Sequence, residues 1–308
     1  MDGTDTVDGL AWWAGPGQDM GAAFARVHGH PSRTLAVRAL ATGMLDLFAR
    51  DLQLAEVLKD AGRYVAAMLA FLLHETGELT LPRLKEACAK SGLLSPGRAR
   101  AVLQFLEHVG YVQQLPRAGR RTAYALTPAF RTAWALQLRA ALEAAAAVEP
   151  GVAALLARPG AVEAFGRVHA GVLLDATVGW GEPPPFLRVF QHPYAGTQIL
   201  WTLIAAGDDP ADFALARYGR ISISALSKRF DVSRVHIKRI FQDAEQHGLG
   251  GLAPDGAIWF SDAGRDQMRM LFTAQLAHIL AAAGQAALAA GGGPDDQICT
   301  VGLSGVAD

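Results

Sequence analysis

The chain has 308 residues, which at roughly 150 residues per domain allows about two domains and a large core. Hydrophobic residues make up 51% of it and charged residues 19%, which excludes an intrinsically disordered protein, and 58 alanines favour helices. The net charge of −1 excludes a global field that would draw it to nucleic acid or anionic lipid, so any basic site must be a local patch. Two cysteines, Cys88 and Cys299, are too few for a disulfide framework or a cysteine-rich zinc module and fit a reducing cytoplasm.

Neither end of the chain predicts membrane insertion. Residues 1–15 are acidic and lack the basic start and apolar core of a signal peptide. Residues 270–294 carry no charged side chain, but polar residues interrupt them and their second half is mostly alanine and glycine, whereas a membrane span needs about 20 strongly apolar residues. We therefore expect a cytoplasmic protein with no membrane partner.

The sequence contains an internal repeat. The segment FARVH at 24–28 returns as FGRVH at 165–169, and 80–112 aligns with 222–252 at its apolar positions and at the glycines Gly110 and Gly248. The repeat predicts five segments: an N-terminal tail at 1–23, a first unit at 24–148, a linker at 149–160, a second unit at 161–289 and a C-terminal tail at 290–308.

In the first unit, the pattern predicts a long apolar helix at 35–60, a second at 62–75 and a short one after Leu81. A longer helix begins after Ser95, because serine is a favoured N-cap and the following proline suits the first helical position, and it ends at Gly110. A hairpin and a last helix from 128 to 148 complete the unit. In the second unit, the same elements are expected at 161–178, at 194–206, after Ile223, after Ser233, in a hairpin with its tip at 254–256, and at 262–289.

A short helix, a turn, a longer helix and a two-stranded hairpin, in that order, resemble a winged helix-turn-helix. With its flanking long helices, each unit resembles a subunit of the MarR family of transcriptional regulators, over 64–147 and 194–283. The resemblance implies a mainly α fold with small β-wings, in which two winged helix-turn-helix units surround a hub of long helices with pseudo-two-fold symmetry. One chain would then act as a pseudo-dimer, with or without further self-association. The resemblance also implies double-stranded DNA as a partner and a small-molecule effector bound between hub and DNA-binding units.

The helices after Ser95 and Ser233 carry the candidate DNA-binding residues. Apolar residues recur at every third or fourth position of each helix and are expected to face the core. The polar residues between them then face outward. Arginine and lysine can donate to guanine or phosphate, and glutamine can pair with adenine, although an ordinary solvated helix face has the same composition. The residues are Arg98, Arg100 and Gln104 in the first unit, and Arg234, His236, Lys238, Arg239 and Gln242 in the second.

The two wings differ in charge. Arg117, Arg120 and Arg121 cluster at the tip of the first hairpin, where a wing would lie along the phosphate backbone. The second hairpin is shorter and has Asp255 at its tip, which should repel phosphate. The sequence therefore predicts that the first unit dominates DNA binding, and that two bound recognition helices would lie roughly 34 Å apart, one turn of DNA.

Other chemistry is not indicated. The nine histidines show no paired metal spacing, and no phosphate-binding loop, dinucleotide fingerprint or serine nucleophile elbow is present, so we expect no enzyme, cofactor or metal. Cys88 is expected in the core, and His28 and His169 in structural hydrogen bonds. Two alternatives remain open: a plasmid-type replication initiator, and a winged-helix protein-interaction scaffold that does not bind DNA.

Overall fold

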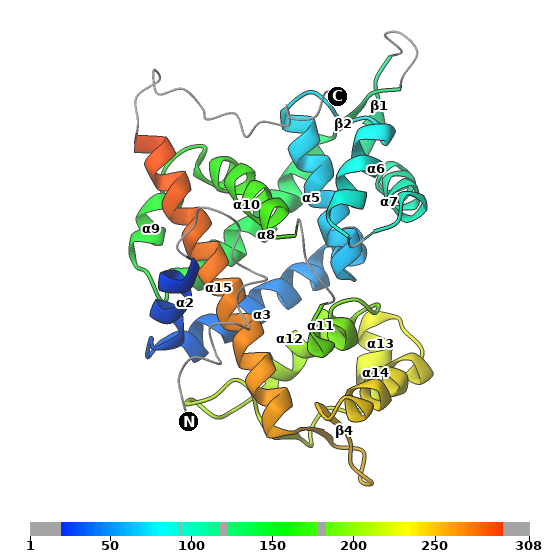
Figure 1. The fold of residues 1–308 in the computed structure, drawn as a ribbon, viewed down its shortest axis with the longest axis vertical. Helices are drawn as coiled ribbons and strands as arrows, with labels where there is room; N and C mark the ends of the chain where they lie inside the picture. The colour runs from blue at the N-terminus through cyan, green and yellow to red at the C-terminus, as the bar shows by residue number, and fades with distance from the viewer. Residues whose placement is uncertain (1–19, 93, 117–121, 178–182, 292–308) are drawn as a thin grey trace.

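The computed structural model describes residues 20–92, 94–116, 122–177 and 183–291, and there the chain is mainly helical with two small antiparallel sheets (Figure 1). In chain order the first half contains α2 (Met20–His28), α3 (Arg33–Arg50), α4 (Leu52–Val57), α5 (Ala61–Glu75), α6 (Leu81–Lys90), α7 (Pro96–His108), β1 (Val112–Gln114), β2 (Tyr124–Leu126) and α8 (Pro128–Ala145). The second half contains α9 (Gly151–Leu156), α10 (Ala161–Thr177), α11 (Pro185–Phe190), α12 (Gly196–Ala206), β3 (Arg217–Tyr218), α13 (Ile223–Phe230), α14 (Arg234–Gln246), β4 (Gly250–Leu252), β5 (Ile258–Phe260) and α15 (Asp262–Gly291).

The single helix expected at 35–60 is wrong, because the chain breaks at Asp51. This residue is extended, with φ of −129° and ψ of 94°, and its carboxylate accepts from the Leu54 backbone N–H to cap α4. The same carboxylate accepts the hydroxyl of Tyr111 at 2.9 Å. A local cap and a long-range hydrogen bond therefore divide the helix, and only the cap is visible to sequence reasoning.

The expected boundaries of the units shift where short segments find packing partners. Helix α2 begins at Met20, inside the predicted tail, because its buried side chains pack against α15. Helix α9 occupies half of the predicted linker and packs against α8, with Val152 and Leu155 buried. In the proline-rich segment, Pro185 takes the first position of α11, where a missing N–H costs nothing.

The predicted repeat is matched in backbone geometry after α7 and α14. Gly110 and Gly248 adopt φ values of +75° and +68°, the left-handed conformation that glycine tolerates best. The hydroxyls of Thr127 and Ser261, which cap the next helices, donate to the carbonyls of these two glycines at 2.7 and 2.6 Å. Equivalent positions in the two halves therefore make equivalent contacts.

The two hairpins differ in size. In the first, β1 pairs with β2, with Val112 opposite Leu126. In the second, β5 lies between β4 and β3, and β3 was not predicted because it is only two residues long. The expected tip is confirmed, since Gly256 has φ of +81° and donates its N–H to the carbonyl of Ala253 at 2.8 Å.

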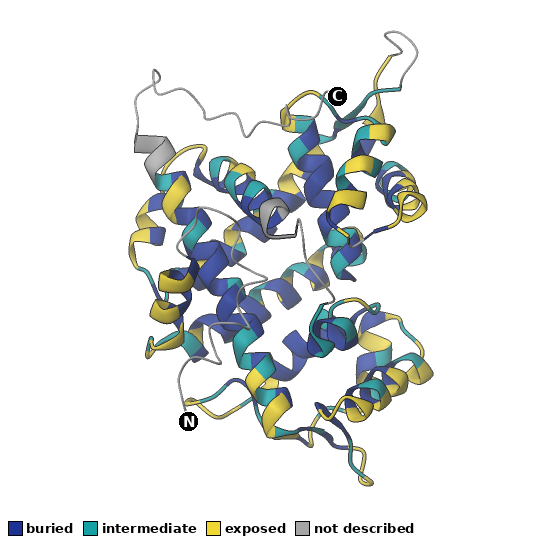
Figure 2. Ribbon diagram, in the orientation of Figure 1, coloured by how far each residue is buried: buried dark blue, intermediate teal, exposed yellow. Residues whose placement is uncertain are grey.

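Long helices form the centre of the molecule. Helix α3 packs against α8 and α12, α10 packs against α15 and α5, and α8 and α15 contact each other. Buried residues concentrate along these helices (Figure 2). Helices α7 and α14 lie on the same side of the molecule, at the right of Figure 1, with the hairpins toward its opposite ends.

Helix α15 is the one described helix that is long and apolar enough to cross a membrane. Two thirds of its apolar window, 67%, is buried inside the protein, against α10, α2, α8 and α3. Its apolar character is therefore explained by its central place in a helical core.

Candidate functional site

Helix α7 has the two faces that its sequence predicts. Its side toward the core is buried, and Ser95 caps it by accepting from the Arg98 backbone N–H at 3.3 Å. Arg98, Arg100 and Gln104 are all exposed, as expected for a surface that could meet a ligand as large as DNA.

Helix α14 repeats this arrangement with one difference. Ser233 caps it through the backbone N–H of His236 at 3.1 Å, and the predicted core face is buried. The exposed residues are Arg234, Lys238, Arg239 and Gln242. His236 was expected to face outward, but it is half-buried, with Nε2 2.8 Å from the carbonyl oxygen of Tyr194. Burial, and to a lesser extent Arg239, lower the pKa of His236.

The wings can be compared only in part. Arg117, Arg120 and Arg121 lie outside the described residues. In the second wing, Asp255 makes an ion pair with Arg217 of the added strand β3. A hydrogen bond from the Ala257 N–H, together with Arg217, lowers the pKa of Asp255. The acid expected at this tip is therefore present, and the extra strand supplies a cation beside it.

Arg98 does more than face solvent. Its Nη2 donates to Oδ1 of Asp60 at 2.8 Å, and the Asp60 side chain is completely buried. Asp60 also caps α5 by accepting from the Arg63 N–H at 2.9 Å. One buried carboxylate thus joins the start of α5 to α7, so that part of the positive charge on α7 is already paired.

A groove of about 530 Å³ separates the two helices. Arg98 and Phe105 of α7 border it on one side and His236 of α14 on the other, with the loop 192–194 between them. The guanidinium of Arg63 lies 4.6 Å from the ring centre of Tyr194 and 4.9 Å from that of Phe105. One face of α7, from Arg98 to Phe105, and His236 near the start of α14 therefore border the same groove.

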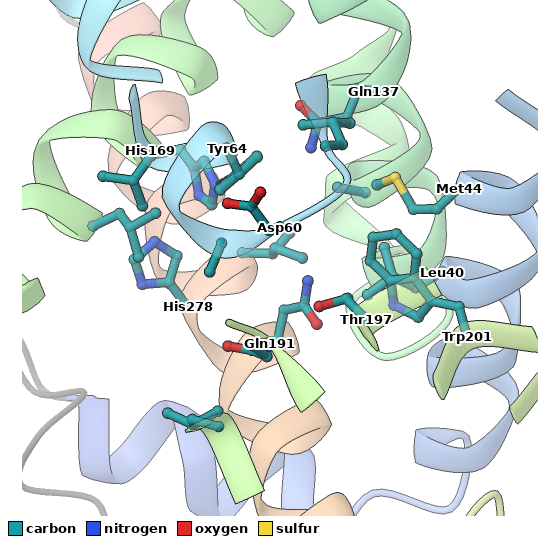
Figure 3. A pocket seen from close by; sticks show the side chains of 18 of the residues that line it. Leu40, Met44, Asp60, Tyr64, Gln137, His169, Gln191, Thr197, Trp201 and His278 are labelled. Carbon is teal, nitrogen blue, oxygen red and sulfur yellow. Dashed lines mark hydrogen bonds between the residues drawn. The ribbon is translucent and has the colours of Figure 1, made fainter. Parts of the chain in front are cut away.

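A cavity of about 140 Å³ adjoins this groove, and His192 lines both (Figure 3). Side chains from α3, α5, α8, α10, α11, α12 and α15 line it, so it sits between the central helices and the segments that carry α7 and α14. Beside the cavity, two backbone hydrogen bonds join residues 59–61 to residues 191–195, from the Ala61 N–H to the Gln191 carbonyl at 3.0 Å and from the Ala195 N–H to the Lys59 carbonyl at 2.8 Å.

One side of the cavity carries two buried histidines. Nε2 of His169 lies 3.0 Å from the hydroxyl of Tyr64, and the rings of His169 and His278 meet edge to face at 4.8 Å. Burial lowers the pKa of His169 well below its usual value and that of His278 to about 4, so both imidazoles are neutral near pH 7. The structural role expected for His169 is confirmed, and His28 likewise contacts Arg33, with Nδ1 to Nη1 at 3.2 Å.

Other candidate chemistry is not assembled in the part of the chain that the structure covers. Within it, no group of three or more His, Cys, Asp or Glu side chains could hold a metal ion. Cys88 is fully buried, as expected, and burial raises the pKa of its thiol to about 12, which keeps it protonated and unreactive. Cys299 lies outside the described residues.

Comparison of the chain with protein-family models, with curated proteins and with solved structures finds no match. The functional argument therefore rests on the two exposed helix faces, the groove and the cavity. Sequence reasoning found the helix faces. From the resemblance it expected an effector between hub and DNA-binding units, but it did not identify the residues of the cavity, and it did not predict the groove. Asp60 carried a visible signal as an N-cap aspartate, but its pairing with Arg98 depends on how α5 and α7 fold together.

Proposed function

We propose that the protein is a cytoplasmic, DNA-binding transcriptional regulator that reads duplex DNA with two winged helix-turn-helix units in one chain. Helices α7 and α14 would be the recognition helices, and the cavity would make the regulator responsive to a small molecule. The observation that carries the proposal is the matched display of basic and amide side chains on two capped helices on the same side of the molecule.

Charge distribution supports DNA as the partner. The segment 80–121 holds eight basic and two acidic residues, a local charge of +6, and 217–265 holds eight and five, a local +3, in a chain of net charge −1. Positive charge is thus concentrated in the segments that include α7, α14 and the hairpins, and phosphate contacts supply most of the affinity of such modules.

The packing of the long helices supports a pseudo-dimer within one chain. The first long helix of each half, α3 or α10, packs against the second helix of the other half, α12 or α5. The pairs α3 with α8 and α10 with α15 are also equivalent in the two halves. Such an exchange of contacts is what a two-fold arrangement of two similar units requires.

DNA binding in this arrangement requires a movement. Arg98 and His236 border one groove, whereas two recognition helices in successive major grooves lie roughly 34 Å apart. The two units would have to separate before both could engage DNA, and a ligand in the cavity beside the groove is well placed to affect that movement.

A gel shift with the DNA upstream of the protein's own gene, against random DNA of equal length, tests the proposal. We expect specific binding that weakens by about 10³–10⁵-fold between 50 and 200 mM salt, as for roughly 6–10 phosphate contacts. Arg100→Ala should weaken binding, whereas Arg139→Ala, which removes an exposed arginine of α8, should not. Absent or salt-independent binding would favour the protein-interaction scaffold.

A further inference from the structure

The cavity is lined by an acidic side chain but by no lysine or arginine among the described residues. The acidic side chain is that of Asp60. His169, His192 and His278 add three imidazoles, and burial lowers the pKa of each, which keeps them neutral near pH 7. The one formal charge among the described lining residues is therefore negative. Arg98 and Arg63 offset part of it from outside the lining, and what is left favours a cation over an anion.

The buried polar atoms also point to a hydrogen-bond donor. Oδ2 of Asp60 and Oε1 of Gln137 are buried acceptors without a hydrogen-bond partner within the described structure. The Asp60 side chain is 0% exposed and Gln137 is 5% exposed. Oδ1 of Asp60 accepts from Arg98 and from the Arg63 N–H, while Nε of Arg63 lies 3.8 Å from Oδ2. Buried acceptors of this kind are costly unless something donates to them.

The remaining surface is apolar and aromatic. In Figure 3, Leu40, Met44 and Trp201 lie on one side of Asp60, and Tyr64 and His169 on the other. A cavity of about 150 Å³ lined by apolar side chains binds benzene in another protein, so about 140 Å³ is enough for a single ring. Aromatic faces also attract organic cations.

We propose that this cavity binds a small arylalkylammonium ion, with its ring against Leu40, Met44 and Trp201 and its ammonium group donating to Oδ2 of Asp60. Gln137 is a further acceptor for the same ammonium group. This inference gives a chemical class to the effector of the proposed regulator, but binding of the ligand does not itself require DNA.

The position of Asp60 connects such a ligand to α7. Asp60 lines the cavity, and its Oδ1 accepts from Arg98. A positive charge placed at Oδ2 competes with Arg98 for the same carboxylate and repels the guanidinium. Ligand binding is therefore expected to loosen the contact between α5 and α7.

Calorimetric titration of the full chain without DNA, with three ligands of similar size, tests the proposal. Benzylamine is a cation near neutral pH, benzyl alcohol is neutral and benzoate is an anion. We expect benzylamine to bind at least tenfold more tightly than benzyl alcohol, and benzoate not to bind measurably. Equal binding of benzoate and benzylamine, or no binding by any of the three, would overturn the proposal.

Two variants locate the site. Asp60→Asn keeps the shape and the helix cap but removes the charge, and it should lose at least tenfold in benzylamine affinity while keeping that for benzyl alcohol. Asp51→Asn, at the N-cap of α4 and outside the cavity, should bind benzylamine like the parent. Ala141→Leu, which fills the cavity from α8, should weaken both benzylamine and benzyl alcohol. Unchanged benzylamine binding by Asp60→Asn would refute the assignment.

The gel shift separates this inference from the proposed function. A chain that shifts DNA but binds none of the ligands retains the regulator proposal and loses this one. A chain that binds benzylamine through Asp60 but no DNA retains this proposal and loses the regulator. Circular dichroism of each variant confirms that a lost titration signal is not lost folding.

Discussion

Arg98 on α7 donates to the buried carboxylate of Asp60 at 2.8 Å, so the residue expected to read DNA also fastens its helix to the body of the protein. Arg98 is 45% exposed and Asp60 is 0% exposed, which makes the pair intermediate between a surface and a buried salt bridge. Because the carboxylate cannot reach water, it depends on Arg98 and Arg63 for compensation.

Arg98→Ala should therefore reduce the free energy of unfolding by about 1–2 kcal/mol, less than the roughly 3–5 kcal/mol lost when a fully buried pair is broken. Arg63 remains beside Asp60 and limits the loss. Urea denaturation measures it. The matched change Arg100→Ala, at an exposed position of the same helix, should stay within about 0.5 kcal/mol of the parent. Equal stability of the two variants would contradict a structural role for the Arg98–Asp60 pair.

Replacing two glycines of α15 by alanine should change the stability of the protein in opposite directions. A Cβ on Gly264 would lie 1.9 Å from the carbonyl oxygen of Leu249, which belongs to the turn that precedes β4. Gly264→Ala should cost about 3 kcal/mol or more, since backbone must move to relieve the overlap. Gly284 has nothing within 4 Å of an added Cβ, so Gly284→Ala should stabilise the helix by about 0.5–1 kcal/mol. Thermal unfolding of both variants decides this, and a stabilising Gly264→Ala would show that the second hairpin does not dock on α15 as described.

The stability of the protein should fall in mild acid because of its buried histidines. The unfolded chain binds protons near the ordinary histidine pKa of 6.5, whereas burial lowers the pKa of His278 to about 4 and that of His169 well below 6.5. Their contribution is therefore complete above pH 6.5 and is lost as pH falls toward 4. His278→Leu should reduce the slope of stability against pH between 5 and 6 by about one proton, or about 1.4 kcal/mol per pH unit. Urea titrations at pH 5, 5.5 and 6 measure the slope, and an unchanged slope would mean that His278 is not neutral when buried.

The two wings should contribute unequally to DNA binding. Changing Arg117, Arg120 and Arg121 together to alanine should weaken binding to all sequences and lower the salt slope by about 1 for each lost phosphate contact. Asp255→Ala should leave binding unchanged or slightly tighter, because it removes an acid and releases Arg217. Fluorescence anisotropy over a salt series measures both. If the triple variant binds like the parent while changes at Lys238 and Arg239 abolish binding, the order of the two units is reversed.

The helix of the first unit should carry sequence preference. Arg100→Ala or Gln104→Ala should alter preference at individual base pairs by about 1–3 kcal/mol if the contact is bidentate. Competition among operator variants with single substitutions measures this. A uniform loss across all variants would instead assign these side chains to phosphate.

Features set by local chemistry could be predicted, and features set by long-range packing could not. Ser95 and Ser233 marked two helix starts because a hydroxyl at the N-cap satisfies a backbone N–H within three residues. Gly110 and Gly248 marked the ends because left-handed backbone favours glycine. The break at Asp51 involves a hydrogen bond to Tyr111, 60 residues away, and the short strand β3 depends on pairing with β5.

In the candidate site, too, the features set by local sequence could be predicted and those set by long-range packing could not. The exposed side chains of α7 and α14 follow from helical periodicity within each segment. The half-buried state of His236 depends on Tyr194, and the cavity collects residues from seven helices, so neither has a signature in any one stretch of sequence.

Helix α3 packs against α12, and α10 against α5, so the two halves of one chain form the pair that two subunits form in a dimer. A dimer of identical subunits presents two copies of one helix, so its operators tend toward palindromes and its occupancy falls when dilution separates the subunits. Here both halves are covalently joined, so dilution does not separate them, and α7 and α14 carry different side chains. On the proposed function, the DNA site has two unlike half-sites read in a fixed order, and the protein binds it in only one of two orientations.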